Sequence, residues 1–106
     1  MTTTEKTYVA TFVAYLSGVY KTPQGLKVFA DTCRELGVTS RDVQACISTE
    51  PAFKSTMYNT LRLMSLDDKK QARQYMVSAA LADGSYVSAM ILNEIFEECN
   101  MFDAVI

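Results

Sequence analysis

The sequence predicts an all-α protein, a compact bundle of five or six helices in a single domain over residues 1–106. Three observations predict this fold class. A chain of 106 residues has room for one hydrophobic core. Only two prolines and four glycines interrupt it, which favours long helices over many short strands. Apolar residues recur at intervals of three and four, and no segment alternates polar and apolar residues long enough to indicate a strand.

The first helix is expected to begin after Thr2, because Thr2 and Glu5 have the spacing of a capping box. The apolar residues between 8 and 20 repeat on one side and predict a one-faced helix that ends near Tyr20 or Lys21.

The second helix is expected to begin at Thr22-Pro23, because threonine can cap a helix and proline suits its first position. Gly37 is the expected left-handed terminator. A third, shorter helix follows, with Thr39 or Ser40 as its cap.

Pro51 is expected to end the third helix and to open the fourth. Ser65 precedes a fifth helix that runs to about Ala82. The pair Asp83-Gly84 then forms a corner, and the sixth helix is expected from Ser88, as its cap, to about Asn100.

Two corners of the chain resemble each other when the sequence is shifted by 66 residues. Gly18 then aligns with Gly84, and Thr22 aligns with Ser88. Both corners combine a glycine break, a capping hydroxyl and an apolar stripe, so residues 8–36 and 72–102 are expected to form two related helical hairpins.

Charge is distributed unevenly along the chain. All ten lysines and arginines lie at or before Arg73, together with seven acids, whereas residues 74–106 contain five acids and no cation. The formal net charge of −2 is unfavourable for a strongly basic nucleic-acid-binding protein. The acidic last third indicates either a solvated helix face or a contact surface for a basic partner.

The residue types present favour a function without catalysis. Histidine is absent, which removes its acid–base chemistry and most transition-metal sites. Cys33, Cys46 and Cys99 lack metal-site spacing and fall on apolar stripes, which is typical of reduced thiols in the cytoplasm. We therefore expect no enzymatic activity, cofactor or metal, and no membrane association, because no run reaches about 18 apolar residues.

Residues 30–47 resemble a DNA-binding helix-turn-helix. A small residue, Cys33, precedes the turn at Gly37 by four positions. In this alternative, DNA would be read by Ser40, Arg41 and Gln44.

Residues 79–100 resemble the Ala-Asp-Gly corner of the tellurite-resistance TerB-like helical domains, through the stretch from Ala79 to Ser88. The resemblance implies an all-helical fold with paired hairpins and an acidic, metal-associated or scaffold role. Asp83 is the acidic residue that carries over as a candidate cation ligand. The family places an aliphatic residue two positions after the glycine and a glutamate early in the next helix, where this chain has Tyr86 and Met90.

The sequence thus favours a protein–protein interaction module: an adaptor, regulator or inhibitor that binds another protein, for which a basic partner is one option. Its contact surface is expected at the acidic and apolar C-terminal end, where a homo-oligomer could also form, and deletion of residues 102–106 is expected to abolish binding while leaving helicity intact. The candidate partner-binding residues are Tyr86, Glu94, Glu97, Glu98, Phe102, Asp103, Val105 and Ile106.

Overall fold

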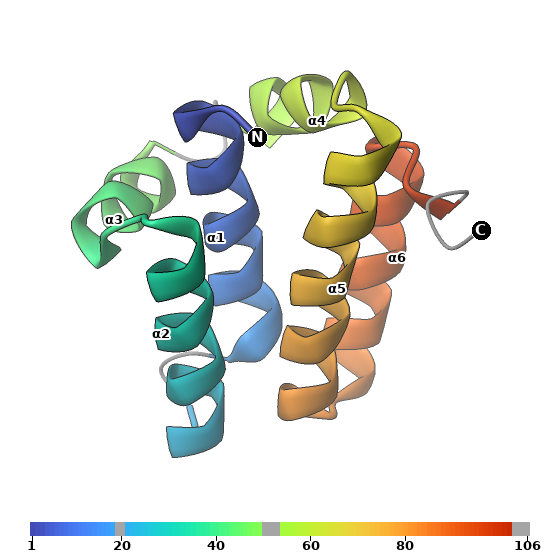
Figure 1. Cartoon of the computed structure of the whole chain (residues 1–106). Coiled ribbons are helices and arrows are strands. Elements are labelled where there is room, and N and C mark those ends of the chain that lie inside the picture. The colour runs from blue at the N-terminus through green and yellow to red at the C-terminus, as the bar shows by residue number, and fades with distance from the viewer. Residues whose placement is uncertain (19–20, 50–53, 103–106) are drawn as a thin grey trace.

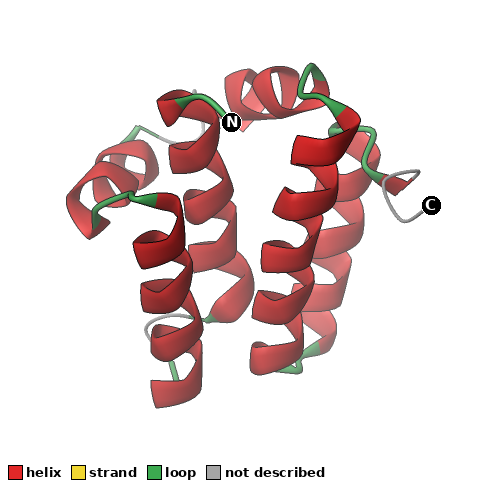
Figure 2. Cartoon of the chain, in the orientation of Figure 1, coloured by secondary structure: helices red, strands yellow, loops and turns green. Residues whose placement is uncertain are grey.

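The computed structural model describes residues 1–18, 21–49 and 54–102, which form six helices and no strand (Figures 1 and 2). The predicted all-α bundle of five or six helices is confirmed. The helices are α1 (Thr3–Ser17), α2 (Pro23–Leu36), α3 (Ser40–Ser48), α4 (Lys54–Arg62), α5 (Leu66–Asp83) and α6 (Tyr86–Glu98).

Helices α1, α2, α5 and α6 run along the long direction of the bundle, whereas α4 lies across one end (Figure 1). Helix α1 is central and packs against α5, α2, α3, α6 and α4. Helix α3 packs chiefly on α1, and α6 contacts α5, α1 and α4. Both α6 and α3 therefore lie at the edges of the bundle and keep one face open.

The expectation that the first helix is one-faced is wrong. Every residue from 8 to 14 is buried, because helices surround α1 on most sides. The polar Thr11 is fully buried, and its hydroxyl donates a hydrogen bond to the carbonyl oxygen of Thr7 at 2.8 Å. This bond satisfies the hydroxyl within its own helix, so burial leaves no polar group without a partner there.

The predicted helix starts are confirmed at four positions, where a hydroxyl side chain accepts a hydrogen bond from a backbone N–H in the first turn. The N-cap residues are Thr2, Thr22, Thr39 and Ser65. Each removes one of the unpaired donors that every helix start carries.

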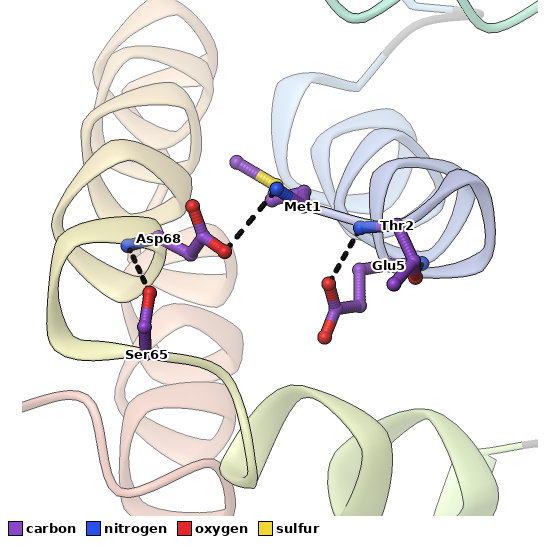
Figure 3. A network of polar contacts seen from close by, with 5 residues as sticks. All are labelled: Met1, Thr2, Glu5, Ser65 and Asp68. Carbon is purple, nitrogen blue, oxygen red and sulfur yellow. Dashed lines mark hydrogen bonds and ion pairs between the residues drawn. The ribbon is translucent and has the colours of Figure 1, made fainter.

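Polar contacts link the start of α1 to the start of α5 (Figure 3). The backbone N–H of Thr2 donates to Glu5 Oε1 at 2.7 Å, and the backbone N–H of Asp68 donates to Ser65 Oγ at 3.2 Å. The amino group of Met1 lies 3.2 Å from Asp68 Oδ2. Asp68 thus supports its own helix start and also holds α1 beside it.

Two predicted helix boundaries are wrong by about three residues each. Helix α1 ends at Ser17, because Gly18 already adopts the left-handed conformation with φ +62°. Helix α6 begins at Tyr86, because Ser85 rather than Ser88 is its cap. The predicted role of Pro51 in opening the fourth helix lies outside the described residues.

The corners at Gly18 and Gly84 lie at the same end of the bundle (Figure 1). A Cβ atom placed on Gly18 would come within 2.6 Å of Asp83 Oδ1, so the two corners touch. Both glycines have left-handed φ, but the next helix begins five residues after Gly18 and two after Gly84. The two hairpins thus share a glycine terminator and differ in loop length, and their common origin stays a prediction.

Candidate protein-binding face on the last helix

Helix α6 divides into a buried side and an exposed side. Ser88, Ile95 and Phe96 are buried against α1 and α5, and the following Cys99 is fully buried. The opposite positions follow the helical spacing of four and seven residues through Tyr86, Met90 and Glu97. We call Tyr86, Val87, Met90 and Glu97 the α6 face.

The apolar members of the α6 face are unusually exposed. The exposed fractions are 80% for Tyr86, 61% for Val87 and 56% for Met90. Leu81, in the last turn of α5 just before the corner, is 76% exposed. Large apolar side chains gathered in this way around one corner are typical of a contact surface.

Glu94 and Glu98 were predicted to bind a partner, but each already forms an ion pair with a cation of α4. Glu94 Oε1 lies 3.3 Å from Lys54 Nζ and accepts a hydrogen bond from the Tyr58 hydroxyl at 3.2 Å. Burial first, and then the charge of Glu94, raise the pKa of Tyr58, so its hydroxyl keeps its proton. Glu98 Oε2 lies 3.8 Å from Arg62 Nη2.

Three cations also reach the backbone at the end of α6 and just after it. Arg62 Nε donates to the carbonyl oxygen of Glu98 at 2.8 Å, and Lys69 Nζ donates to that of Asn100 at 3.4 Å. Arg73 Nη1 donates to the next two carbonyl oxygens, both at 3.0 Å. Cations near a helix C-terminus complement its negative dipole end. Cations that are distant in the sequence therefore gather around the end of the acidic helix α6.

Glu97 is the acid of α6 that remains available. Within residues 1–18, 21–49 and 54–102 no cation forms an ion pair with it. It lies two helical turns beyond Met90 on the same side, so the α6 face has an apolar end and an acidic end.

Phe102, which follows the end of α6, is partly integrated into the fold. Its ring packs edge-to-face on Phe96 with 5.9 Å between ring centroids, and 49% of its surface is exposed. The guanidinium of Arg73 lies over the Phe96 ring, 4.7 Å from its centroid. Removal of Phe102 is therefore expected to lower stability as well as any binding. The predicted contacts of Asp103, Val105 and Ile106 lie outside the described residues.

The carboxylate of Asp83 accepts hydrogen bonds within the corner between α5 and α6. The hydroxyls of Ser85 and Ser88 both hydrogen-bond to its carboxylate. These bonds lower the pKa of Asp83, and Lys21 adds a smaller effect in the same direction. Among the described residues no three metal-ligating side chains gather at one place. The hydrogen bonds from Ser85 and Ser88 give the carboxylate a structural role at the corner.

Ser40, Arg41 and Gln44 come together with apolar side chains of a neighbouring helix. They line a hollow of about 390 Å³ with Leu26 and Phe29 of α2. Helix α3 packs mainly on α1 and makes little contact with α2, whereas the two helices of a helix-turn-helix pack on each other. This arrangement is less favourable for DNA binding by α3 than the sequence pattern indicated.

Sequence reasoning found Tyr86 but missed Leu81, Val87 and Met90. The signal was present, because residues 84–93 contain no charged side chain. Projection of Tyr86 and Met90 on a helical wheel places them opposite the buried stripe. What the sequence did not show was that none of the described helices covers this side.

Comparisons with family models, with curated proteins and with solved structures find no match for this chain. None of the described helices combines the length and the apolar character that a bilayer span requires.

Proposed function

We propose that this chain is a non-enzymatic protein–protein interaction module and that it binds its partner through the α6 face. The observation that carries the proposal is the exposure of Tyr86, Val87 and Met90 along one edge helix, together with that of Leu81 in the last turn of α5. Tyrosine and methionine are enriched at interfaces, because they offer large contact areas.

The charges on α6 indicate which kind of partner to expect. Glu94 and Glu98 already pair with α4, so Glu97 is the acid that a partner can neutralise without breaking an ion pair of the bundle. A partner with an apolar patch and one or two cations beside it fits this face. An adaptor, regulator or inhibitor would act by such contact, in the cytoplasm if the thiols are to stay reduced.

Site-specific photocrosslinking in cells of the native host tests the proposal. A photoreactive phenylalanine analogue replaces Tyr86 in one variant and Leu63 in the other. Leu63 is the matched control, because it is also strongly exposed but lies between α4 and α5. We expect one discrete adduct from position 86 that position 63 does not give, and that Met90→Ser and Glu97→Lys both weaken. Identical products from both positions, or none from position 86, would contradict the proposal.

A further inference from the structure

A second open feature lies next to the α6 face, on the side of the helix that meets α1 and α4. A pocket of about 260 Å³ opens there. Its inner wall is apolar and consists of Phe12 and Tyr15 of α1 and Ile91 and Ile95 of α6. Phe12 and Ile95 are almost completely buried, so they form the closed floor of the pocket and belong to the core of the bundle.

The mouth of the pocket is polar and carries both signs of charge. Lys54 Nζ and Glu94 Oε1 lie 3.3 Å apart, and both side chains are about half exposed. Tyr58 stacks on Phe12 with 5.6 Å between ring centroids, and its hydroxyl donates to Glu94. The aromatic pair therefore fixes the carboxylate at the edge of the apolar wall.

A polar groove continues from the same mouth on its outer side. Lys54, Tyr58 and Glu94 line it as well, together with Ser55 and Asn59 of α4. A ligand at the mouth can thus place an apolar group inward while its polar groups stay in a polar, hydrated environment.

Size and charge together define the ligand. The volume lies below the roughly 300–1,000 Å³ of sites for drug-sized molecules, so the pocket suits one amino-acid-sized group and not a nucleotide. A ligand with a single charge would meet one attractive and one repulsive group at the mouth. A zwitterion can pair with both, and opening an exposed ion pair costs little.

We propose that this pocket binds a free amino acid with a branched or aromatic apolar side chain, with its carboxylate at Lys54 and its ammonium group at Glu94. The side chain fills the space between Phe12, Ile91 and Ile95. This site is separate from the α6 face, so each proposal can fail without the other.

Titration of the full chain with L-leucine and L-phenylalanine, followed by amide chemical shifts in NMR spectra, tests the proposal. We expect saturable shifts centred on Tyr15, Ile91 and Glu94. Three probes separate the recognised groups: 4-methylpentanoate lacks the ammonium group, 3-methylbutylamine lacks the carboxylate, and glycine lacks the apolar side chain. Each is expected to bind at least about tenfold more weakly than L-leucine.

Variants locate the site. Lys54→Met and Glu94→Gln are each expected to weaken L-leucine binding by about tenfold, whereas the matched changes Lys70→Met and Asp67→Asn on α5 leave it unchanged. Circular dichroism melting confirms that all four variants fold. The proposal is overturned by absence of saturable shifts up to ~10 mM ligand, by equal binding of 4-methylpentanoate, or by unchanged binding in both pocket variants.

Discussion

The hydroxyl oxygen of Ser88 lies 2.9 Å from the carbonyl oxygen of Leu16, which joins the first turn of α6 to the last turn of α1 across 72 residues. Both groups are buried. The same hydroxyl also reaches the carboxylate of Asp83, at the end of α5. One small side chain, whose single hydroxyl proton these two acceptors share, therefore lies where three helices meet at the corner from which the α6 face projects.

Replacement of Ser88 by alanine is expected to lower the free energy of unfolding by about 1–3 kcal/mol, because the Leu16 carbonyl loses its partner inside the protein. Urea denaturation measures this change. Ser78→Ala is the matched control, because Ser78 is exposed on α5 and its loss should stay within about 0.5 kcal/mol. Equal effects of the two substitutions would show that the contact does not hold the corner.

Gly37 and Gly18 have the same left-handed backbone conformation but different surroundings. Alanine substitutions at the two positions therefore separate the cost of backbone strain from the cost of crowding. Gly37 has φ +71° and open space where a Cβ atom would lie, so Gly37→Ala should cost about 1–2 kcal/mol from the left-handed conformation alone. Gly18 has φ +62°, and its Cβ would meet Asp83 Oδ1 at 2.6 Å, so Gly18→Ala should cost more. Thermal and urea unfolding compare the two. In the double variant Gly18→Ala with Asp83→Ala, the extra destabilisation of Gly18→Ala over Gly37→Ala should disappear, because the crowding carboxylate is gone. Purely additive effects of the two substitutions would contradict crowding between position 18 and Asp83.

Asp83 is expected to make stability depend on pH in the acidic range. Hydrogen bonds from Ser85 and Ser88 lower its pKa in the folded protein below the unfolded value of about 3.9. The stabilising effect of the carboxylate is then fully present above that unfolded pKa and is lost as the pH falls through the lower folded pKa. The difference in stability between the native chain and Asp83→Asn should thus narrow below about pH 4. Urea titrations at several pH values measure it, and parallel curves would exclude this role.

Arg73 is expected to be the main anchor of the segment after α6. It donates to the carbonyl oxygens of Met101 and Phe102 and lies over the Phe96 ring. Arg73→Gln should lower the free energy of unfolding by about 1.5–3 kcal/mol, and Arg73→Lys by less, because lysine keeps the charge but not the planar guanidinium that lies over the Phe96 ring. Lys70→Gln on the same helix serves as the control. If Lys70→Gln costs as much, the effect comes from the net charge of α5 and not from these contacts.

DNA binding by α3 can be tested directly. The helix-turn-helix interpretation predicts a mobility shift on duplex DNA that weakens steeply with salt and is lost in Arg41→Gln and Gln44→Ala. The packing of α3 on α1 leads us to expect no shift even at low salt. A salt-dependent shift that both substitutions abolish would restore the DNA-binding interpretation.

Much of the fold can be predicted from local patterns. The caps at Thr2, Thr22, Thr39 and Ser65 are among these features, because a hydroxyl before an apolar repeat acts within one turn. The start of α6 is different, because Ser85 and Ser88 both have the side chain of a cap and only the contact of Ser88 with Leu16 distinguishes them.

The candidate site can be predicted only in part. Tyr86 and Glu97 follow from composition and helical spacing, but the pairing of Glu94 with Lys54 and of Glu98 with Arg62 joins residues 40 and 36 positions apart. No local pattern indicates such pairs. The exposure of Met90 also depends on which neighbours α6 has and not on its own sequence.

The sequence by itself determined the helices and most of their starts, and therefore the all-α class. Only the tertiary structure decided that α1 lies at the centre, that cations of α4 pair with acids of α6 and cations of α5 bind the backbone just after it, and that no described helix covers one side of α6. The physical reason is range: capping and periodicity act within a few residues. Burial and ion pairing, in contrast, depend on how distant segments are brought together.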